Sequence, residues 1–134
     1  MKKLVYTVLV FAFSTSVNAF SGADLLSQCR NFIEIIEGGK TDLKHTLDAG
    51  LCGGYVHGVQ EGFIASSQLS LIASEDQGTA PVSRNYWDVP DGVEAEKIVQ
   101  IVVRYLEINK DMQGKPAVLS VINALIQTYP VEKQ

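Results

Sequence analysis

The apolar positions of the chain recur at the spacing of an α-helix over most of its length. The first run of such positions comprises Leu25, Cys29, Phe32, Ile33 and Ile36. It follows Ser21 and Asp24, whose three-residue spacing is typical of a capping box at a helix start. It stops before Gly38-Gly39, and glycine commonly ends helices. The pattern therefore predicts a first helix between the capping box and these glycines.

A second helix is expected from about residue 49 to residue 73, after a short helical turn or loop at 40–48. Small residues occur at every fourth position along it: Gly50, Gly54, Gly58, Gly62, Ser66 and Ser70. Each interior glycine costs about 0.5–1 kcal/mol relative to alanine, so this stripe requires a compensating contact. Two explanations stay open: close approach of a neighbouring helix in the same chain, or contact between two copies of the chain.

Residues 75–92 form the longest segment without helical or strand periodicity. The segment is rich in residues that favour loops: Gly78, Pro81, Ser83, Asn85, Pro90 and Gly92. A loop of this length in a small domain is usually functional or disordered. It also contains Tyr86 and Trp87, which are residue types that often anchor protein interfaces. The alternative is that Trp87 folds back to fill the core.

Two further helices follow this segment. The third is predicted from about residue 93 to residue 108, with a wide apolar face formed by Ile98, Ile101, Val102, Tyr105 and Leu106. The fourth is expected to begin at Pro116 and to end at Pro130, since proline favours the first helical position and stops a preceding helix. The chain is therefore predicted to be a small all-α bundle of four main helices.

Residues 1–19 have the pattern of a secretory signal peptide. Lys2 and Lys3 precede an apolar stretch at 4–13, and Val17-Asn18-Ala19 has the small residues of a cleavage site. A membrane anchor, the alternative, requires roughly 20 apolar residues, so no membrane insertion is expected after cleavage. Residues 20–134 are then one helical domain. Loss of the two lysines changes the net charge from −4 to −6.

The predicted export determines the expected state of the two cysteines, Cys29 and Cys52. Outside the cytoplasm such a pair is expected to form a disulfide bond. The bond would stabilise the fold by about 3 kcal/mol, because it lowers the conformational entropy of the unfolded chain. The alternative is a reactive thiol.

Residue types that support catalysis or metal binding are sparse. His45 and His57 are the only histidines, and the sequence contains no G-x-S-x-G nucleophile motif. His57 and Glu61 are four residues apart, but two ligands do not define a metal site. The acidic net charge without a basic cluster argues against nucleic-acid binding. We therefore expect no catalytic residues, no metal, no cofactor and no nucleic-acid partner.

Several short motifs occur in order along the chain. They are Phe20-Ser21-Gly22 with Asp24-Leu25-Leu26 and Cys29, Cys52-Gly53-Gly54-Tyr55-Val56 with Gly58-Val59, Pro90 with Gly92-Val93, Val102-Val103-Arg104-Tyr105-Leu106, and Ala124-Leu125 with Tyr129-Pro130. With these motifs the sequence resembles the Rap/Tai immunity proteins of type VI secretion systems. Asp88 and Val131 stand where that family commonly has two further cysteines.

The resemblance implies a periplasmic immunity protein without catalytic activity. Such a protein binds a peptidoglycan-cleaving effector of the amidase or peptidase class, blocks its active-site groove, and in several cases is a homodimer. The 75–92 loop is the candidate for the blocking element. Its hypothesised partner contacts are Arg84, Asn85, Tyr86 and Trp87. The net negative charge would attract a basic effector.

Two other functions stay open on the sequence. One is a periplasmic acid-stress chaperone of the HdeA type, which is also small, helical and stapled by one disulfide. The other is an enzyme or small-ligand carrier, which would need a buried pocket with convergent polar groups.

Overall fold

The computed structural model describes residues 19–76 and 86–131 of the chain. Within these ranges the elements are α2 (Gly22–Ile36), α3 (Leu43–Asp76), α4 (Ala95–Ile108), the 3₁₀ helix η2 (Lys110–Gly114) and α5 (Ala117–Thr128). The predicted all-α bundle with four main helices is confirmed. Two isolated β-bridges accompany the helices, Ser21 with Pro116 and Trp87 with Pro130. The predicted signal peptide lies, except for its last residue, outside the described residues.

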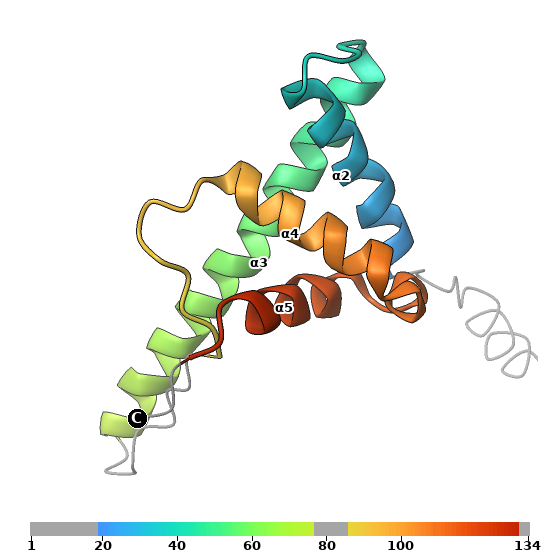
Figure 1. The fold of residues 1–134 in the computed structure, drawn as a ribbon. Coiled ribbons are helices and arrows are strands. Elements are labelled where there is room, and N and C mark those ends of the chain that lie inside the picture. The colour runs from blue at the N-terminus through green and yellow to red at the C-terminus, as the bar shows by residue number, and fades with distance from the viewer. Residues whose placement is uncertain (1–18, 77–85, 132–134) are drawn as a thin grey trace, which may run out of the picture.

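The four helices form two pairs, in which α2 and α3 diverge and α4 and α5 lie across them (Figure 1). Helices α2 and α3 diverge from the end at which residues 37–42 join them, and α4 and α5 lie across the space between them (Figure 1). The C-terminal part of α3 extends past the other helices. The 86–94 segment returns from the region of that extension to the start of α4 (Figure 1).

Both predicted ends of α2 are confirmed. The Ser21 hydroxyl accepts a hydrogen bond from the Asp24 backbone N–H at 3.2 Å, and the Asp24 carboxylate accepts one from the Ser21 backbone N–H at 3.0 Å. This reciprocal pair satisfies backbone donors that a helix start leaves free. At the other end Gly38 has a φ of 81°, which only glycine adopts without strain.

Helix α3 begins earlier than the sequence predicted. The Asp42 carboxylate accepts a hydrogen bond from the His45 backbone N–H at 3.0 Å, which caps a helix that starts at Leu43. Residues 43–48 of the 40–48 segment, which was expected to hold a short helical turn or loop, therefore form the first turns of a 34-residue helix. The helix also continues to Asp76, three residues beyond its expected end.

The core lies where α4 crosses α2 and α5. Its fully enclosed side chains come from all four helices and include Leu25, Val56, Val99, Leu106, Val121 and Leu125. Helix α4 contributes six buried residues, which agrees with the wide apolar stripe in its sequence. The core therefore depends on α4 as its central element.

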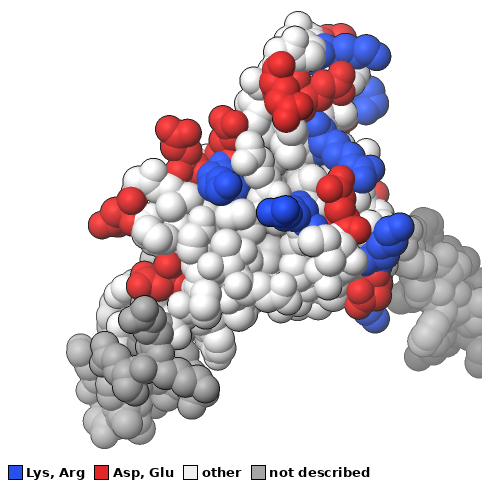
Figure 2. All heavy atoms as spheres, in the orientation of Figure 1, with Lys and Arg blue, Asp and Glu red and all other residues white. Residues whose placement is uncertain are grey.

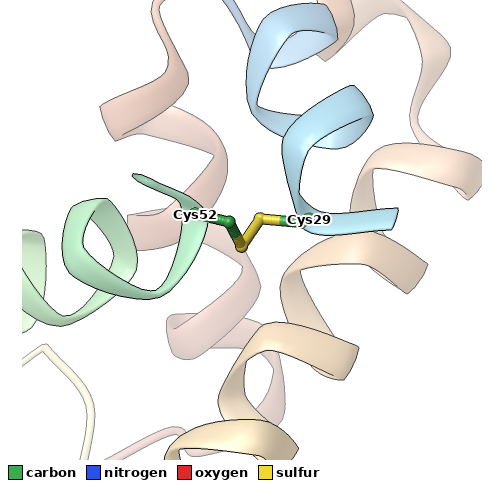
Figure 3. The surroundings of a disulfide bond; sticks show 2 residues. All are labelled: Cys29 and Cys52. Atoms are coloured by element: carbon green, nitrogen blue, oxygen red, sulfur yellow. A yellow bond between two sulfur atoms is a disulfide. The ribbon is translucent and has the colours of Figure 1, made fainter. Parts of the chain in front are cut away.

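A disulfide bond joins α2 to α3, as predicted. Cys29 and Cys52 are both fully buried, their Cα atoms are 5.0 Å apart and the S–S distance is 2.05 Å (Figure 3). The bond lies within the packed core, so it fixes α2 to the first third of α3. None of the described helices has the length and hydropathy that a membrane span requires.

Candidate functional site

The hypothesised partner contacts lie on the segment that precedes α4. Its described part starts at Tyr86, whose side chain is 51% exposed, while the adjacent Trp87 is only 7% exposed. Both rings contact Phe63 of α3. The Trp87 ring centroid is 4.2 Å from that of Phe63, and the Tyr86 ring meets it edge-on at 5.5 Å. Phe63 therefore supports one buried ring and one exposed ring.

Trp87 is buried, and its hypothesised role as a partner contact stays a proposal. Its side chain fills the space between α3 and the end of α5, in agreement with the alternative that it folds back into the core. The backbone is held there as well, because Trp87 pairs with Pro130 and the Asp88 N–H donates to the Tyr129 carbonyl at 2.9 Å. Asp88 thus lies beside Tyr129 at the end of α5.

The other three hypothesised contacts differ in what the structure says of them. Tyr86 is exposed beside the buried Trp87 and remains available to a partner. Arg84 and Asn85 lie outside the described residues.

A shallow cleft of about 210 Å³ adjoins this aromatic cluster. Its lining combines apolar rings with amide, hydroxyl and carboxylate groups: Gln60, Phe63, Ile64, Ser67, Gln68, Trp87, Asp88 and Val89. Ile64 is 51% exposed at its edge. Apolar rings together with hydrogen-bonding groups are also found in protein interfaces.

The glycine stripe of α3 faces away from the rest of the fold. A β-carbon placed on Gly50, Gly54, Gly58 or Gly62 would meet no atom of the described residues within 4 Å. Close approach of a neighbouring helix within the described part of the chain therefore does not explain the stripe. Gly53, by contrast, faces α2, because a β-carbon placed on it would lie 3.5 Å from the Phe32 ring.

Large apolar side chains share this outward face of α3. With 100° of rotation per residue, they and the four glycines fall within a sector of about 120°. Their exposed fractions are 86% for Leu43, 60% for Leu47, 49% for Leu51, 66% for Leu69 and 64% for Ile72. None of these five side chains was predicted from the sequence to share a face with the glycines, and Leu43 and Leu47 lay outside the predicted helix because 40–48 was expected to hold a short helical turn or loop. The four-residue spacing of Leu43, Leu47 and Leu51 is the signal that would have revealed them.

Groups with acid–base or metal-binding chemistry are few and mostly paired within the described ranges. His45 Nδ1 lies 2.8 Å from the Asp42 carboxylate, and its Nε2 lies 3.8 Å from Glu34. His57 Nε2 and Glu61 are 4.0 Å apart on the exposed side of α3. No set of three His, Cys, Asp or Glu residues among those described is placed to hold a metal ion.

The family model of the Rap1a immunity proteins matches residues 21–131. The match runs from the capping serine of α2 to the residue after Pro130 and thus includes all four helices. Comparison with curated proteins and with solved structures gives no significant match.

Proposed function

Because this chain belongs to the Rap1a immunity proteins, which makes it an immunity protein against a secreted effector, we propose that its target is a peptidoglycan-cleaving effector delivered by type VI secretion. The target would be of the amidase or peptidase class. The observation that carries this proposal is the family match across residues 21–131. The protein would act by occupying the effector, without catalysis of its own.

The proposed contact element is the part of the 75–92 segment that follows α3, which ends at Asp76, with Tyr86 as its exposed anchor and Arg84 and Asn85 beside it. The buried contact between Trp87 and Phe63 supports this assignment, because it fixes the backbone directly next to Tyr86. A segment that is held in position before binding loses less conformational freedom in the complex. Trp87 would thus contribute to affinity by positioning Tyr86.

The proposed compartment is the periplasm. Residues 1–19 have the pattern of a cleaved export signal, and the buried Cys29–Cys52 disulfide suits an oxidising environment. The domain that acts there would be residues 20–134, with a net charge of −6. This charge favours encounter with a basic effector.

We also propose that two copies of the protein associate along the outward face of α3. Five large apolar side chains are exposed on this face, and burial of apolar surface favours association. The four glycines leave the helix backbone uncovered, so a second helix can approach it closely. The dimer would then provide the compensating contact that the stripe does not find among the described residues of one chain.

The experiment that tests the main proposal is affinity capture with the mature protein. Residues 20–134, immobilised with the disulfide intact, are incubated with periplasmic and secreted extracts of the species of origin. The expected result is recovery of one cell-wall hydrolase whose cleavage of purified peptidoglycan stops at stoichiometric amounts of the immunity protein. An unrelated exported protein of similar charge is the control bait.

Two results would contradict the proposal. Capture of a partner that has no activity on peptidoglycan would replace the target class. Capture of many unrelated proteins, increasing at low pH, would favour the acid-stress chaperone instead.

A further inference from the structure

A second concave surface lies between α4 and α5, separate from the aromatic cluster. This groove has a volume of about 380 Å³. Its lining residues from α4 and the turn after it are Lys97, Ile101, Arg104, Tyr105, Ile108 and Asn109, and those from α5 and its end are Ala124, Gln127, Thr128 and Tyr129. None of these residues is acidic, although the protein as a whole carries a net charge of −4.

The two basic residues of the groove lack an acidic partner among the described residues. Lys97 and Arg104 are both exposed, and neither has a carboxylate within ion-pair distance there. Arg30, by contrast, pairs with Glu107 at 2.9 Å. Figure 2 shows basic groups over α4 beside a broad uncharged surface that covers α4 and α5. The groove is thus a locally cationic site on an acidic protein.

The spacing of the two cations defines the ligand that the groove suits. Lys97 and Arg104 are seven residues apart, so they lie on one side of α4 with about 10 Å between their backbone positions. An extended peptide covers about 10 Å in three residues. In polyproline II, an extended conformation that rises about 3.1 Å per residue and repeats its side-chain direction every third residue, two carboxylates at positions i and i+3 would therefore face both cations together.

Apolar contact is available between and beside these cations. Ile108 is 71% exposed at one end of the groove, and Ile101 is partly buried along its wall. The floor is closed by Ala124 and Tyr105, with 1% and 9% of their surfaces exposed. An apolar side chain of the ligand would cover Ile101 and Ile108 and remove them from water.

We propose that the α4–α5 groove binds an acidic segment of a partner protein, in which two carboxylates three residues apart flank an apolar side chain. Arg104 and Lys97 bind the carboxylates, and Ile101 and Ile108 contact the apolar side chain. The inference rests on the groove alone and does not require the effector proposed above. A free anion is a poor match, because it would leave the isoleucines exposed.

The test uses a defined peptide with the full mature chain. A fluorescein-labelled octapeptide carries glutamates at its third and sixth positions, with leucine between them, and a matched peptide carries glutamines instead. Anisotropy at about 50 mM salt, where exposed charges are weakly screened, is expected to show about tenfold tighter binding of the acidic peptide. Raising the salt concentration to about 0.3 M should remove most of this difference.

Variants locate the binding. Arg104→Ala and Lys97→Ala should each lower the affinity for the acidic peptide by about three- to tenfold. Arg104→Lys keeps the charge and should therefore retain most of the wild-type affinity. Arg30→Ala is the matched control, an exposed arginine on α2 outside the groove, and should leave affinity unchanged. The proposal would be overturned if the two peptides bound with equal affinity or if neither bound up to about 1 mM. It would also be overturned if Arg30→Ala lowered the affinity as much as the groove variants do. Unchanged urea midpoints verify that each variant is folded.

Discussion

The indole ring of Trp87 lies 4.2 Å from the ring of Phe63, at an interplanar angle of 34°. This contact attaches the segment before α4 to the middle of α3, far away in sequence. Trp87→Ala removes a side chain that is 7% exposed and is expected to lower the free energy of unfolding by about 3 kcal/mol or more. Urea denaturation of the mature protein, followed by circular dichroism, measures the change.

Tyr86→Ala is the matched control for this prediction. Its side chain is 51% exposed, so the loss in stability should stay below about 1 kcal/mol, while affinity for the captured effector falls at least about tenfold. A folded Tyr86→Ala protein that binds the effector as tightly as the wild type would remove Tyr86 from the interface.

Gly22 packs directly against the backbone of η2. A β-carbon at this position would overlap the Met112 carbonyl oxygen and approach Leu106 Cδ2 to 3.0 Å. Gly22→Ala is therefore expected to destabilise the protein by about 1–3 kcal/mol through overpacking. Gly114→Ala, where a β-carbon meets nothing within 4 Å, should change stability little. Thermal unfolding of both variants tests the contrast, and equal melting temperatures would argue against the close approach at Gly22.

The outward face of α3 predicts a concentration-dependent dimer. Sedimentation equilibrium of residues 20–134 should show association, and Leu47→Glu should weaken it by at least about tenfold, since it places a charge in an apolar contact. Leu47 is 60% exposed in the single chain, so the monomer should remain folded. Leu119→Glu, at a 43% exposed leucine of α5, is the control. Equal effects of the two variants, or a wild-type monomer at all concentrations, would disprove the proposed interface.

Two serines of the fold should respond oppositely to replacement by alanine. The Ser120 hydroxyl is fully buried and has no hydrogen-bond partner among the described residues. Ser120→Ala removes this unsatisfied group and should leave stability unchanged or raise it by up to about 1 kcal/mol. Ser21→Ala removes the cap of α2 and should cost about 1 kcal/mol. Urea midpoints measure both, and a marked loss with Ser120→Ala would indicate a bound water or other partner.

Two aspartates that accept hydrogen bonds at helix starts are expected to make the stability of the protein depend on pH in the acid range. The Ser21 hydroxyl, and then its backbone N–H, lower the pKa of Asp24 below its ordinary value. The His45 backbone N–H, and then its side chain, lower the pKa of Asp42 in the same way. In the unfolded chain both carboxyls regain their ordinary pKa, near 4.

Because both pKa values are lowered on folding, these groups stabilise the protein above about pH 4 and lose that contribution as the pH falls through their folded pKa values. Stability from these groups should therefore be flat between pH 7 and pH 5 and decline below about pH 4. Urea midpoints of the wild type and of Asp24→Asn across pH 7 to 2 test this, since the variant should show a shallower acid decline. A wild type that unfolds above pH 5 would contradict it. A client-aggregation assay in the same titration tests the acid-stress chaperone alternative.

Features that depend on neighbours in sequence were predictable. The cap formed by Ser21 and Asp24, the stop at Gly38 and the apolar face of α4 each involve residues within a few positions, and the structure confirms them. The predicted start of α3 was wrong because the sequence was not read as placing a helix cap at Asp42. The direction of the Trp87 side chain depends on Phe63, and the α4–α5 groove depends on how two helices cross. Both are contacts between elements distant in sequence, and the periodicity of a single helix does not predict such contacts.

The 34-residue length of α3 has a mechanical consequence. From Phe63 to Asp76 the helix extends for about 20 Å at 1.5 Å per residue, so a bend of about 10° displaces its end by about 3.5 Å. Small changes in helix direction at the contact between Phe63 and Trp87 are therefore amplified at the C-terminal end of α3. A partner that binds this end would load the contact, and the rigidity of the contact would limit the displacement.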